Sequence, residues 1–289
     1  MTFDWDSLFR PKQRGGTDVL LGLLGSGISR SRTPGMHMAE AAALGISCTY
    51  RLLDTDIAPG PVDLNALFDR LEAAGYAGIN VTFPYKQAVI PHLHQVLESA
   101  QKVGAVNTVL FRDGQRIGEN TDYSGFRKSL SLGLPDVAKD RVLLIGAGGA
   151  GGAVASALID EGVGRLLIHD SDIAKATGLA LRFGDRAEVV ADLCAAAASA
   201  NGIVNATPVG MDKLPGLPLP DDMIAPHHWV GDIVYFPLET ALLKAARAKG
   251  CRVLPGSGMA LYQAVRAFEL FTGLSPDPKR MWAAFEAAA

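Results

Sequence analysis

The stretch RVLLIGAGGAGGAVASALIDEGVGRLLIHD, residues Arg141–Asp170, identifies the fold class most directly. Its apolar run Val142–Ile145 predicts a strand, the small residues from Ala150 to about Glu161 predict a helix, and Leu166–His169 predicts a second strand. A glycine-rich turn joins the first strand to the helix, which completes a βαβ unit of about thirty residues. The two strands therefore run parallel in one sheet, because the helix returns the chain to the same end.

The alternation continues downstream and extends this sheet to six strands. The further predicted elements are helix Ile173–Phe183, strand Ala187–Val190, helix Leu193–Ala198, strand Gly202–Ala206, strand Val230–Tyr235, helix Glu239–Lys249 and strand Arg252–Leu254. Such a pattern predicts a Rossmann-type doubly wound parallel sheet. Residues Met259–Ala289 are mostly helical and have no strand to follow them.

The first half alternates in the same way and predicts a second α/β domain with a largely parallel sheet. Its predicted elements are strands Asp18–Leu24, Thr49–Leu53 and Ala77–Thr82, and helices Pro34–Gly45, Val62–Ala74, Pro84–Ile90 and His94–Val103. Two extended runs then flank Asp113-Gly114, a dipeptide typical of a β-hairpin turn. This hairpin would place Asn107 and Asp122 near its open end, on opposite strands.

Length and composition indicate a globular protein of two domains. The chain has 289 residues, of which 48% are hydrophobic and 20% charged. A net charge of −3 offers no basic surface for nucleic acid or an anionic membrane, and no apolar run reaches the length of about 18 residues that a membrane span needs. Three widely spaced cysteines, and charges throughout residues 1–16 in place of an apolar leader, predict a cytoplasmic location without nucleic-acid or membrane partners.

A phosphate-binding pattern lies inside the βαβ unit. Gly146, Gly148 and Gly151 have G-x-G-x-x-G spacing, in which the second glycine lets a pyrophosphate approach the backbone and the third lets the helix pack closely on the strand. Asp170 ends the next strand, where a carboxylate binds the adenosine ribose of NAD and repels the 2′-phosphate of NADP. We therefore predict NAD rather than NADP. The alternatives are a glycine turn without a ligand and an Asp170 that only caps the next helix.

Polar side chains also follow the predicted strands of the first half. Lys86 lies in the first turn of a predicted helix, where the helix dipole disfavours a cation, so it is either a functional residue or a solvated surface lysine. The hydroxyls of Ser31 and Thr33 suit a polyhydroxylated or carboxylated ligand, or they cap the next helix. His92 and His94 do not share a helical face, so we expect no metal site. No G-x-S-x-G segment indicates a serine hydrolase.

Seven ordered segments resemble the shikimate dehydrogenase family along nearly the whole chain. The matching segments are Ser31–Pro34, Asn80–Lys86, Gly104–Thr108, Gly118–Asp122, Gly146–Gly151, Asn205–Met211 and Gly256–Gln263. The resemblance implies a substrate-binding and catalytic domain of residues 1–125 and 256–289, and an NAD-binding Rossmann domain of residues 126–255. It also implies that the C-terminal helices pack back on the substrate domain.

The same resemblance implies roles for individual residues. Lys86 and Asp122 would form the catalytic pair. The carboxylate and hydroxyls of the substrate would be held by Ser31, Thr33, Thr82, Asn107, Tyr235 and Gln263. The cofactor would contact Gly146, Ala147, Gly148, Gly149, Ala150, Gly151, Asp170, Asn205, Thr207, Val209 and Gly256.

Two departures from the common family pattern resemble the NAD-dependent quinate/shikimate dehydrogenase branch. Thr33 stands where most members have serine, and His169–Asp172 replaces the stretch that binds the 2′-phosphate of NADP. We therefore expect reversible oxidation of shikimate to 3-dehydroshikimate, of quinate to 3-dehydroquinate, or of both, by a monomer or homodimer. This activity points to quinate catabolism rather than to the shikimate pathway of aromatic amino acid biosynthesis alone.

Three alternative functions stay open. The first is a divergent paralogue, such as an aminoshikimate dehydrogenase or another cyclic hydroxy-acid dehydrogenase. The second is a methylene-tetrahydrofolate dehydrogenase, although the hydroxyl-bearing segment and Gln263 suit a polyol acid better than a pterin. The third is a dinucleotide-binding protein without catalytic activity.

Overall fold

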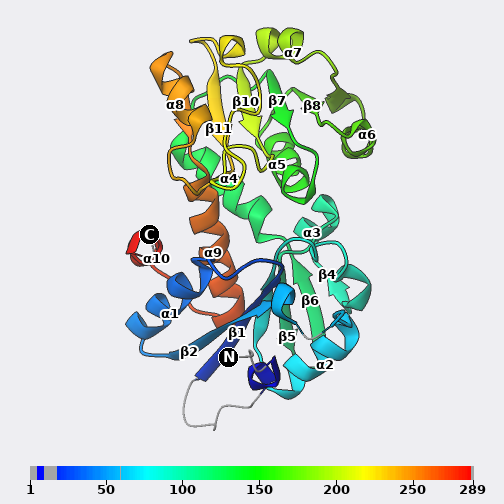
Figure 1. The fold of residues 1–289 in the computed structure, drawn as a ribbon, viewed down its shortest axis with the longest axis vertical. Coiled ribbons are helices and arrows are strands. Elements are labelled where there is room, and N and C mark those ends of the chain that lie inside the picture. The colour runs from blue at the N-terminus through cyan, green and yellow to red at the C-terminus, as the bar shows by residue number, and fades with distance from the viewer. Residues whose placement is uncertain (1–4, 10–17, 59, 288–289) are drawn as a thin grey trace. The chain divides into compact units, whose positions relative to one another are not determined.

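The computed structural model describes residues 5–9, 18–58 and 60–287. It divides into two compact units, Met1–Thr121 with Ala264–Ala289 and Asp122–Gln263, and each unit contains a six-stranded sheet (Figure 1). The predicted two-domain α/β class is therefore confirmed. The predicted border after residue 125 falls inside a helix, and the functions of the two domains stay predictions. Residues 1–16, interpreted as lacking a leader, lie mostly outside the described residues.

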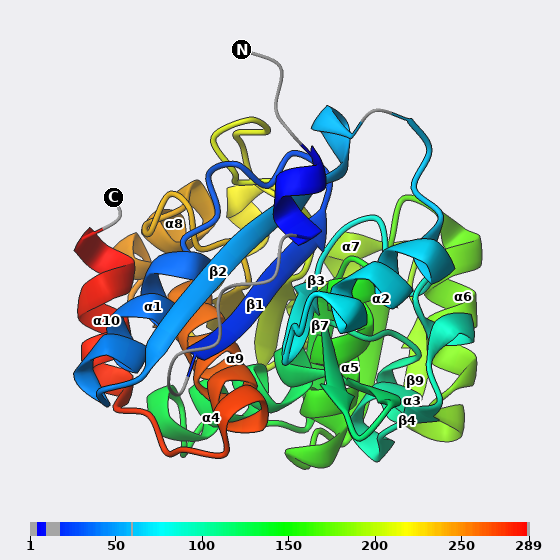
Figure 2. The same ribbon diagram turned by 90° about the horizontal axis from the view of Figure 1, so that it is seen from below.

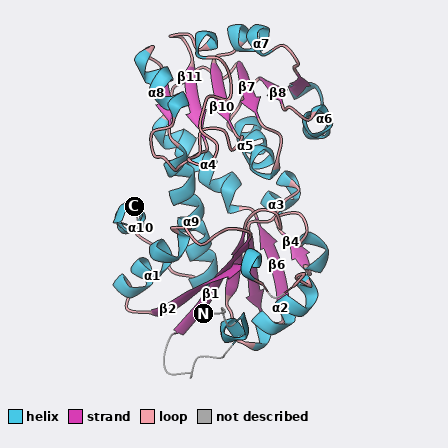
Figure 3. Cartoon of the chain, viewed as in Figure 1, coloured by secondary structure: helices cyan, strands magenta, loops and turns pink. Residues whose placement is uncertain are grey.

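The first unit is built on a mixed sheet with strand order β2-β1-β3-β5-β6-β4 (Figure 3). Its strands are β1 (Asp18–Gly25), β2 (Ser47–Asp54), β3 (Gly78–Val81), β4 (Gln95–Val96), β5 (Thr108–Arg112) and β6 (Gln115–Glu119). Strand β1 is parallel to β2 and β3, whereas β5 is antiparallel to β3 and to β6. The expectation of a largely parallel sheet is thus confirmed for this unit, because β4 and β6 run in the same direction as β1, β2 and β3. Of the six described strands, β5 alone runs in the opposite direction.

Helices cover the first sheet and complete its core. They are α1 (Thr33–Ala43), α2 (Leu64–Ala73), α3 (Glu98–Val103), α10 (Pro278–Ala287) and the C-terminal part of α9 (Gly256–Thr272), with short 3-10 helices η1 (Trp5–Phe9), η2 (Thr55–Ile57) and η3 (Ile90–His92). Successive residues of β1 point to opposite faces, so Leu24 packs in one core with Phe68, and Leu21 in another with Phe271. Helix α10 lies against α1 (Figure 2), which confirms that the C-terminal helices pack on the first domain.

The predicted hairpin is confirmed and joins β5 to β6. Asp113 and Gly114 both have positive φ, +52° and +71°, as a two-residue type I′ turn requires. At the open end, Asn107 N donates a hydrogen bond to Glu119 O (3.1 Å). The hairpin therefore brings the residue before β5 next to the end of β6. The expectation that Asp122 lies on the opposite strand is wrong, because β6 ends at Glu119 and Asp122 is in the first turn of α4.

Two helix predictions in the first half are wrong. Residues 83–89 form consecutive turns in place of the helix Pro84–Ile90, because Lys86 O accepts a hydrogen bond from Val106 N (2.7 Å) and is not available to the next helical turn. Of the predicted helix His94–Val103, only the C-terminal part is helical, as α3. Before it, His94 N and Leu97 N donate to carbonyls at either end of the β4–β6 pairing, and the intervening residues form β4.

The second unit contains the predicted doubly wound sheet, with all strands parallel in the order β12-β11-β10-β7-β8-β9. Its strands are β7 (Arg141–Ile145), β8 (Arg165–His169), β9 (Ala187–Val189), β10 (Gly202–Asn205), β11 (Trp229–Asp232) and β12 (Arg252–Leu254). Its helices are α4 (Thr121–Gly133), α5 (Gly149–Asp160), α6 (Ile173–Leu181), α7 (Leu193–Ser199), α8 (Ala241–Ala248), the start of α9, and the 3-10 helices η4 (Gly184–Arg186) and η5 (Asp221–Met223). The chain order reverses at β7, and ligands of such sheets bind at this point, beyond the carboxyl ends of the strands.

Helix α4 is an element that the sequence pattern did not predict.

Among the described residues, none of the helices combines the length and apolar character that crossing a bilayer requires.

Candidate active site

The loop after β1 carries Ser31 and Thr33. Asp54, the last residue of β2, accepts hydrogen bonds from Gly27 N (2.9 Å) and Ile28 N (3.0 Å) and so holds the start of this loop. Ser31 N donates to Ile28 O (2.9 Å), and Ser31 Oγ accepts from Thr33 N (3.3 Å), the first N–H of α1. The Ser31 hydroxyl thus contacts the helix start, but the N-cap of α1 is Arg32 and has no side-chain capping hydrogen bond, so the capping alternative is not confirmed. The side chains of Ser31 and Thr33 are half-buried.

Thr82 and Lys86 follow β3 at the same edge of the sheet. Thr82 N donates to Leu24 O (2.9 Å) near the end of β1, and Lys86 O accepts from Val106 N (2.7 Å) shortly before β5. Lys86 is half-buried and lies in turns rather than in a helix. The argument from an unfavourable helix dipole therefore does not apply, and the case for Lys86 rests on its segment and its place at the strand ends.

Asn107 is buried just before β5, and neighbouring groups hold its side-chain amide. Its Oδ1 accepts from Thr121 N (2.7 Å) and Thr108 Oγ1 (3.1 Å), and its Nδ2 donates to Thr121 Oγ1 (3.0 Å). Asn80 donates to Thr108 Oγ1 (3.0 Å) and accepts from Tyr50 OH (2.7 Å). The sequence pattern did not identify Asn80, Thr108, Thr121 or Tyr50 as supports of Asn107, although the first three belong to segments that it singled out.

Asp122 lies in the first turn of α4 and is buried. The helix is attached to the end of α5 by Arg127, whose Nε donates to Glu161 Oε1 (2.9 Å). Asp122 belongs to the second unit and Lys86 to the first. The pairing of these two side chains therefore stays a prediction.

The glycine-rich turn between β7 and α5 has the geometry of a dinucleotide-binding loop. Gly146 has φ +107°, which favours glycine, and its N–H donates to His169 O (2.8 Å). A Cβ at Gly151 would lie 2.1 Å from Gly146 O, so this position needs glycine for close packing. A Cβ at Gly148 would meet no atom within 4 Å. The backbone is thus open to a ligand at the N-terminus of α5, where N–H groups favour a phosphate.

Asp170 connects this turn to the end of β8. Its Oδ2 accepts from Ala147 N (2.7 Å) and its Oδ1 accepts from Asp172 N (2.8 Å). Partial burial acts to raise the pKa of Asp170, but these hydrogen bonds and the nearby charge of Lys175 hold it below its usual value. Asp172, not Asp170, is the N-cap of α6, so the interpretation of Asp170 as a helix cap is wrong.

A second hydrogen-bonded cluster lies at the ends of β10 and β11. Asn205 accepts from Thr207 Oγ1 (2.7 Å) and donates to Val209 O (3.0 Å) and Asp232 Oδ1 (2.9 Å). Asp232 also accepts from Thr240 Oγ1 (2.6 Å), and burial raises its pKa to about 6 although its hydrogen bonds oppose the shift. The structure thus brings Asn205, Thr207 and Val209 together. The sequence pattern did not point to Asp232. The feature that could have identified it is its position as an acidic residue at the carboxyl end of a strand.

Three further predicted residues lie at the end of β11 and on α9. A Cβ at Gly256 would lie 2.5 Å from Ile233 O, so the helix starts close against the strand end. Tyr235 follows β11 and is 41% exposed, and Gln263 Nε2 donates to Ala260 O (3.0 Å) in its own helix. Tyr235 and Gln263 belong to the second unit, so their role beside the substrate residues of the first unit stays a prediction.

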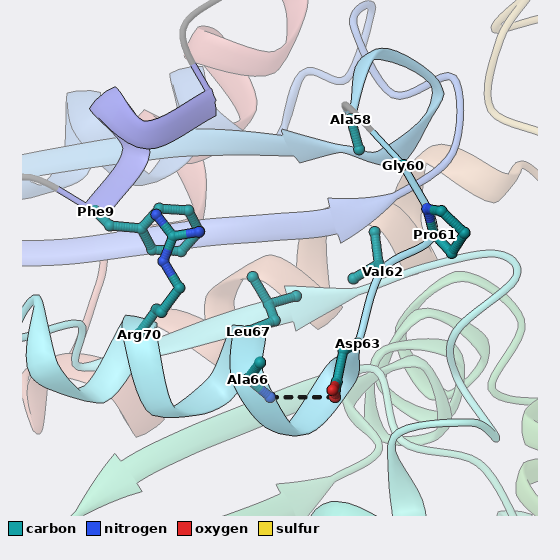
Figure 4. Close-up of a pocket in the computed structure, with 9 residues that line it drawn as sticks. All are labelled: Phe9, Ala58, Gly60, Pro61, Val62, Asp63, Ala66, Leu67 and Arg70. Carbon is teal, nitrogen blue, oxygen red and sulfur yellow. Dashed lines mark hydrogen bonds between the residues drawn. The ribbon is translucent and has the colours of Figure 1, made fainter.

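A cavity of about 320 Å³ between η1 and α2 contains none of the predicted site residues (Figure 4). Its wall includes Leu67 and the ring of Phe9, over which the Arg70 guanidinium lies 3.7 Å from the ring centre. Within the described parts of the chain, no three His, Cys, Asp or Glu side chains gather as metal ligands would.

Comparison with known proteins extends these observations. Residues 23–109 match the model of the shikimate dehydrogenase substrate binding domain, residues 130–210 that of shikimate / quinate 5-dehydrogenase, and residues 256–284 that of the shikimate 5'-dehydrogenase C-terminal domain. The quinate/shikimate dehydrogenase (NAD(+)) of Corynebacterium efficiens is 50% identical over 277 residues, which cover 92% of this chain and 97% of that protein. The chain belongs to the shikimate dehydrogenase family. The resemblance seen in the sequence is thereby confirmed.

Similar members of the shikimate dehydrogenase family differ in the cofactor that their names give. The shikimate dehydrogenase (NADP(+)) of Streptomyces avermitilis is 46% identical over 272 residues, covering 91% of this chain and 94% of that protein. The solved structure of quinate dehydrogenase from Corynebacterium glutamicum in complex with NAD is 46% identical, with a TM-score of 0.90 over 93% of this chain and 99% of that chain. Overall sequence identity is therefore similar to relatives whose names give NAD and to relatives whose names give NADP.

Proposed function

We propose that this protein is an NAD-dependent dehydrogenase that reversibly oxidises quinate, shikimate or both to the corresponding 3-dehydro ketone. The observation that carries the proposal is the carboxylate of Asp170, which is bonded to the glycine turn through Ala147 N and has a lowered pKa. An ionised carboxylate at this place binds ribose hydroxyls and repels the 2′-phosphate of NADP. The relatives from Corynebacterium whose names specify NAD support the same cofactor.

The residues of the second unit fit a bound NAD. The open space at Gly148 suits the pyrophosphate, which N–H groups at the start of α5 stabilise. Asp170 accepts one backbone hydrogen bond on each oxygen, which leaves a lone pair on each for a ribose hydroxyl. When bound, NAD supplies the acceptor for the hydride that leaves the alcohol carbon.

In this proposal the first unit and the residues around it hold the substrate and move its proton. Oxidation of a secondary alcohol releases the hydroxyl proton, which needs an acceptor within hydrogen-bond reach. Lys86 Nζ accepts this proton and returns it in the reverse reaction, and Asp122 orients the Lys86 side chain. The carboxylate and hydroxyls of the substrate bind to Ser31, Thr33, Thr82, Asn107, Tyr235 and Gln263. For Asn107, the bonds to Thr121 support this role because they set which side of the amide is the donor.

We further propose that the enzyme is cytoplasmic and acts as a monomer or homodimer. The three widely spaced cysteines are consistent with a reducing compartment.

The test is a panel of quinate and shikimate against NAD and NADP, followed by Lys86→Ala. With the preferred pair, Lys86→Ala is expected to lower kcat by about 10²–10⁴-fold, because general base catalysis contributes that much. NAD affinity, measured by calorimetry, should stay within about twofold, since Lys86 does not belong to the glycine turn. Lys102→Ala, an exposed lysine on α3 of the same unit, is the matched control and should keep wild-type kcat.

Each other outcome of these experiments would contradict one part of the proposal. Preference for NADP would overturn the role given to Asp170, and unchanged kcat in Lys86→Ala would remove Lys86 from the chemistry. Tight NAD binding with no turnover of either acid would favour a divergent substrate or a binding protein without catalytic activity.

A further inference from the structure

Arg32 lies between Ser31 and Thr33, and its side chain is not directed to solvent. It is 8% exposed, and its Nη1 donates a hydrogen bond to Phe285 O (3.1 Å), a residue 253 positions further along the chain. The guanidinium also lies over the Phe285 ring, 4.9 Å from its centre. The turn with the two hydroxyls is therefore attached to the last helix of the chain, α10.

The partner atom of Arg32 is suited to a cation. Phe285 O is one of the last carbonyls of α10, which ends at Ala287, and such carbonyls have no partner within their own helix. They also form the negative end of the helix dipole, so a guanidinium there is stabilised by charge as well as by the hydrogen bond. The Phe285 ring is itself buried and stacks on Trp282, with ring centres 5.3 Å apart.

Helix α10 is held on α1 at its other end as well (Figure 2). Glu40 on α1 is fully buried and accepts from Arg280 Nη2 (2.7 Å), Arg280 Nε (2.9 Å) and Asp277 N (2.8 Å). The start of α1 thus contacts the end of α10, and the later part of α1 contacts the start of α10. Two polar contacts of this kind fix both the distance and the register of the helix pair.

We propose that Arg32 is a positioning residue for the substrate and that α10 is the support against which it works. Arg32 contacts both the carbonyl and the ring of Phe285, and these contacts hold the backbone of the turn so that the Ser31 and Thr33 hydroxyls keep one orientation toward the bound acid. This inference rests on the proposed function, because it deepens the role given to these two hydroxyls. A contact more than two hundred residues away in sequence would then set the affinity for the substrate.

The experiment compares Arg32→Met and Phe285→Leu with the wild-type enzyme in steady-state kinetics. Arg32→Met, which loses both contacts, is expected to raise KM for quinate or shikimate about tenfold, which corresponds to about 1.4 kcal/mol of binding free energy. Phe285→Leu keeps the carbonyl that accepts from Arg32 and removes only the ring, so it is expected to raise KM by a smaller factor. The value of kcat and the KM for NAD should stay within about twofold, because neither residue belongs to the proposed proton pathway or to the glycine turn. Phe285→Leu keeps the charge of Arg32 and so separates positioning from a direct effect of that charge on the substrate.

Arg112→Met is the matched control. Arg112 Nη2 donates to Leu270 O (3.0 Å) near the end of α9, so this variant also removes an arginine contact to the last turns of a helix in the first unit. It is expected to keep the wild-type KM for the acid.

Three results would overturn the inference. One is an unchanged KM in Arg32→Met while only the melting temperature falls, and another is an equal rise of KM in Arg112→Met. The third is a wild-type KM in Phe285→Leu, which would mean that the contact with the Phe285 ring does not position the turn. A wild-type enzyme that oxidises neither acid with NAD would instead contradict the proposed function.

Discussion

Two glycines of the dinucleotide turn should respond to alanine in opposite ways, although they are only three residues apart. Gly151→Ala places a methyl group 2.1 Å from Gly146 O, a backbone atom within the turn. Gly148→Ala places its methyl group where no protein atom lies within 4 Å. We therefore expect Gly151→Ala to lower stability and Gly148→Ala to lower NAD affinity with little effect on stability.

The structure supports a magnitude for each effect. The Gly151 methyl group must move by at least about 1.3 Å to reach an ordinary contact distance of about 3.4 Å, and forcing a methyl group into packed structure costs about 1–3 kcal/mol. In a chain of this size that cost lowers the melting temperature by about 2–4 °C per kcal/mol. Gly148 has φ −74° and ψ −168°, which any residue adopts, so alanine there should change stability by less than about 1 kcal/mol.

The loss of NAD affinity in Gly148→Ala follows from the same open space. A methyl group that occupies the place of the pyrophosphate should raise Kd about tenfold or more, or by about 1.4 kcal/mol and upward. Thermal unfolding without ligand measures the first effect, and isothermal titration with NAD measures the second. Gly178→Ala on α6, which also has open space around its Cβ, is the control and should raise stability by about 0.5–1 kcal/mol.

The reasoning fails if the two variants do not separate. Wild-type NAD affinity in Gly148→Ala would show that the pyrophosphate does not approach the backbone at this glycine. A melting temperature of Gly151→Ala equal to that of the wild-type protein would show that the turn moves without cost.

Two further predictions follow from ionisable groups. The pKa of Asp170 lies below its usual value, so its carboxylate is charged at neutral pH. Asp170→Asn removes this charge and should raise the ratio of kcat/KM with NADP to kcat/KM with NAD about tenfold. An unchanged ratio would contradict the role given to Asp170. Burial lowers the pKa of His37 from 6.5 to about 3, so the unfolded chain binds a proton that the folded chain does not. Stability should therefore fall by about 2 kcal/mol from pH 7 to pH 5, and His37→Leu should reduce this slope in urea unfolding; an identical slope would refute the assignment.

Local signals accounted for much of the architecture. Asp113-Gly114 predicted a hairpin because two residues with positive φ are needed in such a turn, and the structure has both. The spacing of Gly146, Gly148 and Gly151 predicted a strand, turn and helix in the correct places because its constraints act within a few residues. In these segments the interactions that shape the backbone are close together in the chain.

Other features depended on distant partners and were predicted wrongly or not at all. Residues 83–89 are turns because Val106 N takes the carbonyl of Lys86, and no pattern near Lys86 shows that bond. Asp232 became visible as a support only when β11 was placed beside β10 and Asn205.

Periodicity, glycine spacing and the order of the motifs were enough to predict the fold class, the family resemblance and the candidate residues, because each of these signals depends on residues that are close together in the chain. The contacts that orient those residues required the folded chain. The Asn107 amide is held by Thr121, and the turn at Arg32 is held by Phe285. Hydrogen bonds and packing act over a few ångströms in space, whatever the separation in sequence, so their partners are known only once the chain has folded.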